Sequence, residues 1–200
     1  SMPQELQTQD EARRNLMADL PHELRTPLAV VQARLEGVID GVYPADAEQL
    51  QGLLENTRVV SRLVEDLRTL ASAEGGALTL KKENTDIVVL ANDVAASLSA
   101  QAQERGVTLE VKAASDLWIE IDPVRIREVL VNLVSNALRY THKGGRVTIG
   151  LSRGARRLVV SVADTGAGIP ATDLPRIFDR FYKAADSPGS GLGLTIARRF

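Results

Sequence analysis

The sequence has no cysteine among its 200 residues. This absence excludes a disulfide framework, thiolate zinc sites and thiol catalysis. No apolar run approaches the ~18 residues that a membrane-spanning helix needs, and the polar start from Ser1 to Asp10 lacks the pattern of a secretory signal. Neither sign of charge dominates, because 24 Lys and Arg stand beside 26 Asp and Glu. The charge therefore gives no reason to expect nucleic acid or an anionic membrane as a partner.

Residues 1–74 are predicted to form a helical hairpin, because apolar side chains recur there at alternating steps of four and three. One series is Leu24, Leu28, Val31, Leu35, Val38 and Val42, and the other, after the turn-forming run from Asp40 to Asp46, is Leu50, Leu53, Val60, Val64, Leu67 and Ala71. Two antiparallel helices with such narrow seams cannot cover one another fully. We therefore expect a homodimer in which two hairpins form a four-helix bundle. A hairpin with a purely structural role has the same pattern.

Residues 75–200 are predicted to form a second domain, a layered α/β sandwich, so the chain as a whole belongs to the α+β multidomain class. Period-two alternation predicts strands from Leu78 to Lys82 and from Val107 to Lys112, around a helix from Asp86 to Gln103, and a short strand from Leu117 to Ile121. Asp122-Pro123 is typical of a helix start, and this helix should run to Tyr140. The segments Val147 to Leu151 and Leu158 to Val162 are expected to form a hairpin around Gly154.

In the first helix, His22 lies two positions before the seam residue Leu24, which is about 200° around the helix axis. The imidazole should therefore face solvent, where it is available for chemistry. Thr26 lies one turn later on the same face, and Glu23 adjoins the histidine. An ordinary surface histidine between helix-breaking prolines is the alternative.

The helix after Asp122 carries Asn132 and Asn136 one turn apart, away from its apolar face. Amide oxygens are suitable ligands for Mg²⁺. Arg139 and Tyr140 extend this polar face with a cation for phosphate and an aromatic surface for a base. A polar helix face turned to water would look the same.

Two glycine-rich runs complete the candidate site. Asp164-Thr165-Gly166-Ala167-Gly168 follows a predicted strand, where an acceptor carboxylate beside two glycines lets a planar base approach the backbone. Gly189-Ser190-Gly191-Leu192-Gly193-Leu194 opens the last predicted helix, where free backbone N–H groups can hold phosphates. Each run alone is more often a simple turn.

Together these segments resemble bacterial sensor histidine kinases. The run from His22 to Leu28 is similar to the family's H box, and the run from Asn132 to Tyr140 to its N box. The two glycine-rich runs resemble the G1 and G2 boxes, and the run from Ile177 to Tyr182 resembles the F box between them. The boxes occur in the family's order. The resemblance implies a dimeric four-helix bundle followed by an ATP-binding domain of the histidine kinase, gyrase and chaperone type.

The resemblance also implies roles for single residues. His22 would accept the γ-phosphoryl group of ATP on Nε2, Glu23 would hold Nδ1–H, and Thr26 would help to position a water for dephosphorylation of the partner. Asn136 would bind Mg²⁺, and Asp164 would accept a hydrogen bond from the adenine amino group. The implied ATP-binding residues are Asn132, Asn136, Arg139, Tyr140, Asp164, Gly166, Gly168, Arg180, Gly189, Gly191, Leu192 and Gly193.

The implied function is autophosphorylation of His22 with Mg²⁺ and ATP, followed by transfer to an aspartate in the receiver domain of a response regulator. A dimeric scaffold that binds nucleotide without transfer is an alternative. An ATPase of the gyrase or chaperone type is another, although the H box argues against it.

The resemblance also bears on how complete the chain is. The resemblance implies a cytoplasmic fragment of a membrane-anchored sensor, and Ser1-Met2 resembles a cloning scar followed by a chosen start, which fits the removal of an upstream part. We also expect an incomplete domain, because the run between Lys183 and Gly189 is shorter than is usual in the family and the sequence ends at Phe200 within a predicted helix.

Overall fold

The computed structural model describes residues 24–74, 79–113, 116–154, 157–183 and 190–199. The chain divides into two compact units, Ser1–Leu78 with Arg180–Leu192, and Thr79–Asp179 with Gly193–Phe200. Across the described segments, no helix combines the length and the apolar character required to cross a membrane.

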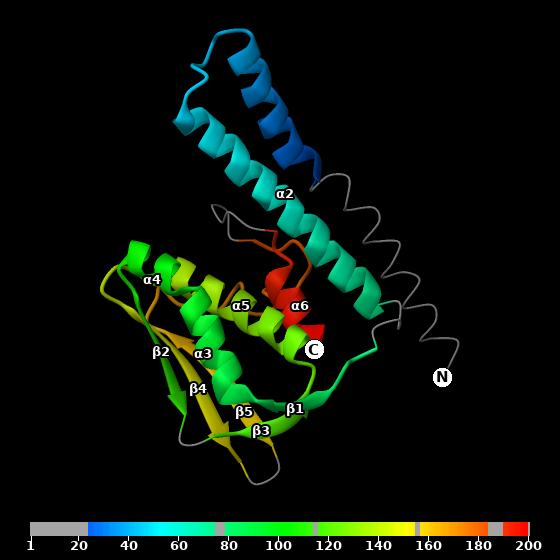
Figure 1. Ribbon diagram of the computed structural model, residues 1–200, viewed down its shortest axis with the longest axis vertical. Helices are drawn as coiled ribbons and strands as arrows, with labels where there is room; N and C mark the ends of the chain where they lie inside the picture. Colours follow the sequence, from blue (N-terminus) through cyan, green and yellow to red (C-terminus); the bar gives the residue numbers. More distant parts are fainter. Residues whose placement is uncertain (1–23, 75–78, 114–115, 155–156, 184–189, 200) are drawn as a thin grey trace. The chain divides into compact units, whose positions relative to one another are not determined.

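The first unit contains the predicted helical hairpin. Residues 24–39 are helical, residues 40–46 form the turn, and α2 (Ala47–Glu74) runs back alongside the first helix (Figure 1). Gly41 has a φ of +72°, a left-handed conformation that ends the first helix. The prediction that Val42 continues the helical seam is therefore wrong, since this residue lies in the turn and is 70% exposed.

The apolar seam predicted for α2 is buried only in part within one chain. Its buried leucines are Leu53, Leu63, Leu67 and Leu70. Leu50 and Val64, which the seam places inside, are 56% and 50% exposed. A single neighbouring helix covers only one stripe of α2, so the rest of the seam stays uncovered within one chain.

The second unit is built on a three-stranded sheet with the order β2-β4-β5. β2 (Thr108–Ala113) pairs in parallel with β4 (Arg146–Arg153), and β4 pairs antiparallel with β5 (Leu158–Asp164). The predicted β4–β5 hairpin is confirmed, and at its turn the Gly154 N–H donates to the Arg157 carbonyl at 2.8 Å.

A second, two-stranded antiparallel sheet is formed by β1 (Glu83–Asp86) and β3 (Trp118–Ile121). The strand predicted from Leu78 to Lys82 is wrong, because the described residues 79–82 precede β1 and are not in a strand. Pairing with β3 selects the later residues, with Glu83 opposite Ile121. The alternation of residues in the local sequence cannot predict this register, because it depends on a strand that lies far away in the sequence.

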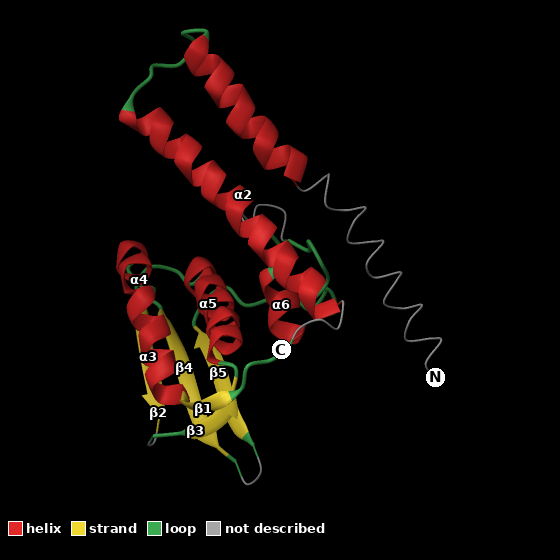
Figure 2. Ribbon diagram, turned by 45° about the vertical axis from the view of Figure 1, so that its right-hand side comes forward, coloured by secondary structure: helices red, strands yellow, loops and turns green. Residues whose placement is uncertain are grey.

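Helices cover one face of the larger sheet (Figure 2). They are α3 (Ile87–Ser97), α4 (Ser99–Arg105) and α5 (Pro123–Tyr140), and the short α6 (Gly193–Arg199) packs against α5. One continuous helix from Asp86 to Gln103 was expected, but the chain leaves helical geometry at Leu98, with φ −103° and ψ 3°. The hydroxyls of Ser97 and Ser99 donate to backbone carbonyls beside this break, where they compete with regular helix bonding.

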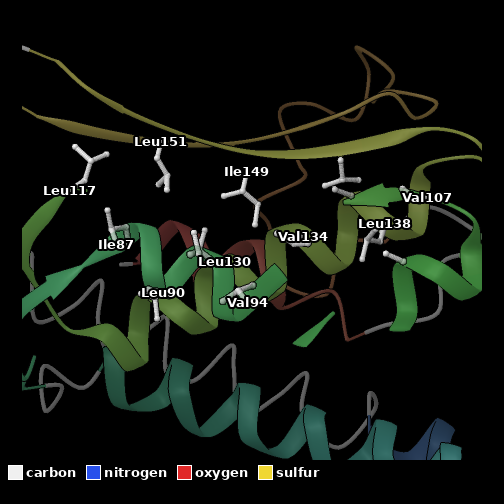
Figure 3. Packing of buried hydrophobic residues seen from close by; sticks show 14 residues of the cluster. Ile87, Leu90, Val94, Val107, Leu117, Leu130, Val134, Leu138, Ile149 and Leu151 are labelled. Atoms are coloured by element: carbon white, nitrogen blue, oxygen red, sulfur yellow. The ribbon is translucent and has the colours of Figure 1, made fainter. Parts of the chain in front are cut away.

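The core of the second unit lies between the larger sheet and the helices. Ile149 and Leu151 of β4 point toward the helices, where Leu130 and Val134 of α5 face the sheet (Figure 3). These four side chains are at most 4% exposed. Full burial of such a side chain contributes about 1.5–3 kcal/mol relative to exposure. This packing fixes the position of α5, the helix that carries the candidate asparagines.

Asp122 caps α5 as predicted. Its Oδ1 accepts hydrogen bonds from the N–H groups of Val124 at 3.1 Å and Arg125 at 3.2 Å, and its Oδ2 accepts from the Lys81 N–H at 2.9 Å. Burial alone raises the pKa of Asp122, but these three hydrogen bonds to the charged form outweigh it and lower the pKa.

Asp122→Ala is expected to lower the free energy of unfolding by about 1–2 kcal/mol at pH 7, measured by urea denaturation, because the cap of α5 is lost. Since the folded-state pKa is lowered, the stabilisation from this carboxylate is present above the ordinary aspartate pKa of about 3.9. It is lost as the pH falls through the lower folded value.

Asp122→Asn is the matched control, because it keeps an Oδ1 acceptor for the cap and loses only the charge. Its stability at pH 7 should lie between those of the parent and Asp122→Ala, with a weaker loss in acid. An asparagine variant no more stable than the alanine variant would contradict the capping role.

Candidate functional site

The polar face of α5 is offset from its buried face. Asn132 and Asn136 lie one turn apart and are half-buried, whereas Leu130, Val134 and Leu138 are fully buried. Among the residues that the structure describes, the Asn136 side chain makes no hydrogen bond. A half-buried amide oxygen without a protein partner is suited to a ligand or a hard cation.

α6 begins against this polar face. A Cβ added at Gly193 would lie 3.3 Å from Cγ and 3.4 Å from Oδ1 of Asn132. A larger residue at this position would push the asparagine aside. The structure thus brings together two residues that are far apart in the sequence and were both predicted to be in the site.

The loop after β5 packs against the last turn of α5. A Cβ at Gly166 would clash with the carbonyl oxygen of Tyr140, and the Ala167 N–H donates to this same oxygen at 3.3 Å. The Gly166 N–H donates to Oδ1 of Asp164 at 2.8 Å, which orients the exposed carboxylate. The structure therefore places Asp164, Gly166 and Tyr140 together. Gly168 follows with a φ of +72°.

Thr165 is a loop residue that the sequence did not single out. Its N–H donates to the Arg146 carbonyl at 3.1 Å, and its Oγ1 accepts from the Arg146 N–H at 2.9 Å. These two bonds fasten the loop to the start of β4. Neither this pairing nor the role of the Tyr140 carbonyl has a signal in the local sequence, because both depend on tertiary contacts.

Of the predicted ATP-binding residues that the structure describes, Arg180, Gly191 and Leu192 lie in the first unit. Gly191 has a φ of +70°, and a Cβ there would lie 2.7 Å from Cα of Phe181, whose N–H donates to the Gly191 carbonyl at 3.1 Å. Arg180 is half-buried and Leu192 is fully buried.

The hydrogen bonds of Ser190 in this run were not anticipated. Its Oγ donates to Oδ2 of Asp66 on α2 at 2.7 Å and accepts from the Leu192 N–H at 3.2 Å. The expectation that the backbone N–H groups of this run are free is thus wrong for Leu192.

Of the three residues predicted to act in phosphoryl transfer on the first helix, the structure describes only Thr26. Thr26 lies in the helix of residues 24–39 with an exposed side chain. His22, Glu23 and Gly189 lie outside the described residues.

The described residues fit a nucleotide with a magnesium ion carried largely by its phosphates. They contain no cluster of three or more His, Cys, Asp or Glu side chains that could hold a metal by itself. Mg²⁺ commonly combines one or two protein oxygens with substrate phosphates and water. Asn136 can supply one such oxygen, and the exposed Asp164 carboxylate beside Gly166 can accept a hydrogen bond from a base.

Two family descriptions match the chain. "His Kinase A (phospho-acceptor) domain" matches residues 12–76, and "Histidine kinase-, DNA gyrase B-, and HSP90-like ATPase" matches residues 121–200. The chain is also similar to the signal transduction histidine-protein kinase BaeS of Escherichia coli (strain K12), with 33% identity over 196 residues. That match covers 96% of this chain and 42% of BaeS, so the chain spans less than half the length of this curated relative.

Solved structures show the same similarity. The histidine kinase AdeS of Acinetobacter baumannii is 33% identical with a TM-score of 0.78, and the match covers 89% of this chain and 84% of that one. Full-length ShkA in complex with AMPPNP is 32% identical with a TM-score of 0.64, over 93% of this chain and 40% of that one.

Gly166→Ala is expected to displace the loop that carries Asp164, because the added Cβ clashes with the Tyr140 carbonyl. We expect the free energy of unfolding to fall by about 1–3 kcal/mol. The dissociation constant for ATP, measured by calorimetry, should rise about tenfold or more.

Gly144→Asn is the control for this loop variant. Gly144 has a φ of +84° with nothing within 4 Å of an added Cβ, and asparagine tolerates this conformation. ATP affinity should survive this change, and equal losses in both variants would show that the loop contact has no special role.

Proposed function

Because this chain belongs to the histidine kinases of bacterial two-component systems, we propose that it transfers the γ-phosphoryl group of ATP to His22 and then to an aspartate of a response regulator. The observation that carries this proposal is the presence, on one chain, of a match to a phospho-acceptor domain followed by a match to an ATPase domain. We assign residues 1–74 to the dimerisation and phosphoacceptor domain and residues 75–200 to the ATP-binding domain.

The ATP-binding role of the second domain is supported by its loop and helix geometry. In this proposal Asp164, oriented by the Gly166 N–H, accepts a hydrogen bond from the adenine amino group. Tyr140 offers its half-exposed ring to the base. Gly166 and Gly168 keep the backbone close to the nucleotide.

The phosphate groups would be held by residues from α5 and from the run that precedes α6. Asn132 and Asn136 face the phosphates, with Asn136 as the protein ligand of Mg²⁺, and Arg139 supplies a positive charge. The run Gly189, Gly191, Leu192 and Gly193 and the half-buried Arg180 complete the proposed set. Bound Mg²⁺ supplies charge neutralisation on the phosphates.

At the acceptor, Glu23 would hold Nδ1–H of His22, which leaves Nε2 unprotonated as the nucleophile. Attack of Nε2 on the γ-phosphorus forms the N–P bond and breaks the bond to the bridging oxygen, so ADP leaves. A receiver aspartate then takes the phosphoryl group and returns the histidine to its starting state. Thr26, whose side chain is exposed on the helix of residues 24–39, would help to position a water that dephosphorylates the regulator.

The proposed homodimer is supported by apolar surface that a single hairpin leaves exposed. Leu28, Leu35, Leu50 and Val64 are 43–56% exposed. Packing of a second hairpin against these side chains would complete a four-helix bundle. The same bundle would present His22 and a docking surface for the regulator.

Incubation with Mg²⁺ and ATP is expected to produce an acid-labile phosphoryl group on this chain and none on His22→Gln, read on a phosphate-affinity gel. The phosphoryl group should be acid-labile because an N–P bond is broken when its nitrogen is protonated. Adding a receiver domain should then move the label to the regulator.

His22→Gln should still bind ATP by calorimetry, because the change lies outside the ATP-binding domain. A parent chain that binds ATP but never becomes phosphorylated would favour the nucleotide-binding scaffold. A label that persists on His22→Gln would mean that another residue is the acceptor.

Asn136→Ala is expected to lower the initial rate of His22 phosphorylation by about 10²-fold, because the protein ligand that holds the charge-neutralising Mg²⁺ is lost. Asn92→Ala on α3 is the matched control, since the side chain of this exposed asparagine donates to the Val88 carbonyl in its own helix and has no other partner among the described residues. If both variants keep the parent rate over a titration of Mg²⁺, Asn136 is not the metal ligand.

A further inference from the structure

The segment that resembles the F box is attached to α6 by two contacts in the second unit. Thr195 Oγ1 donates to the main-chain carbonyl of Phe178 at 3.1 Å. The guanidinium carbon of Arg198 lies 5.7 Å from the centroid of the Phe178 ring. Thr195 is 7% exposed, so its hydroxyl is buried against the carbonyl that it binds. Phe178 itself is 38% exposed, so the two contacts tie a partly exposed residue to α6.

These two contacts come from one face of α6. Thr195 and Arg198 are three residues apart, which places them about 60° apart around the helix, while Gly193 lies roughly opposite. Gly193 is the residue that closely approaches Asn132 of α5. α6 and α5 lie side by side (Figures 1 and 2). α6 therefore contacts the asparagine helix on one side and holds Phe178 on the other.

The segment that ends at Phe178 has little structure of its own to hold it in place. Residues 171–179 form successive turns rather than a regular helix or strand. Their internal backbone bonds are short-range, with the Arg176 N–H donating to Asp173 and the Asp179 N–H to Arg176, each at 2.8 Å. Such turns open easily unless an outside contact fixes them. Thr195 and Arg198 provide this contact.

We propose that Thr195 and Arg198 are positioning residues that hold Phe178 against α6 and set the rate of phosphoryl transfer to His22 without setting ATP affinity. This inference rests on the proposed function. Among the groups assigned to ATP binding, Asn136 and Asp164 lie on α5 and β5 and do not contact Thr195 or Arg198 among the described interactions, and Gly193 lies on the opposite side of α6. Loss of the contacts should therefore disturb alignment for transfer more than ground-state binding.

The first test is amide hydrogen exchange on the full chain without nucleotide. Thr195→Val removes the hydroxyl at nearly constant volume, and the amides of Arg176 and Asp179 should then exchange about tenfold faster. Thr195→Ser keeps the hydroxyl and should restore slow exchange. Amides in α5 should be unchanged in both variants. Unchanged exchange at Arg176 and Asp179 in Thr195→Val would overturn the proposal.

The second test separates rate from affinity. Thr195→Val and Arg198→Gln should each lower the initial rate of His22 phosphorylation by about 5- to 10-fold, with the dissociation constant for ATP within about twofold of the parent. Arg105→Gln, at the exposed last turn of α4, is the charge-matched control and should keep the parent rate.

Parallel losses of rate and affinity, or a failure of Thr195→Ser to recover the rate, would show that α6 acts through overall stability and would overturn the positioning role. If the parent chain forms no phosphohistidine, the proposed function fails, and the exchange comparison still decides whether Thr195 holds the segment.

Discussion

The candidate site depends first on how α5 is buried. Leu130, Val134 and Leu138 recur every four residues and pack into the core beneath β4. Asn132 and Asn136 each follow a buried residue by two positions, which is about 200° around the helix. The helix therefore cannot bury its leucine and valine stripe without presenting both asparagines on the other side. The same packing places the Tyr140 carbonyl where the loop after β5 can reach it.

The sequence predicted most of the second unit because its elements have strong local signals. The cap and proline at the start of α5, the turn at its end and the β4–β5 hairpin all follow from nearby residues. The errors have two causes, a distant partner at β1 and local side-chain bonding to the backbone at the α3–α4 break. β1 begins at Glu83 because β3 pairs with it there, and the α3–α4 break at Leu98 depends on serine hydroxyls that bond to the backbone. In α2, the spacing of apolar residues does not predict which of them stay exposed in a single hairpin.

In the candidate site, too, the sequence predicted the features that depend on local spacing and missed those that depend on tertiary contacts. Spacing alone placed Asn132 and Asn136 on one helix face, and the glycine-rich runs were predicted beside strand and helix ends, where the structure has them. The partners that make these glycines necessary lie elsewhere in the chain. Gly166 meets the Tyr140 carbonyl, Gly193 meets Asn132, and Thr165 bonds to Arg146. No local pattern contains those contacts, because they exist only after the sheet and helices have packed.

The parallel pairing of β2 with β4 affects the order in which the protein can fold as it leaves the ribosome. Parallel neighbours need a long crossover, and here β3 and α5 must both be synthesised before β2 meets its partner. Until then β2 has no strand beside it. The helical hairpin, in contrast, pairs two helices that are neighbours in the sequence, and such local contacts form fast. The two parts of the chain therefore reach their native structures at different times during translation, with the hairpin first and the sheet last.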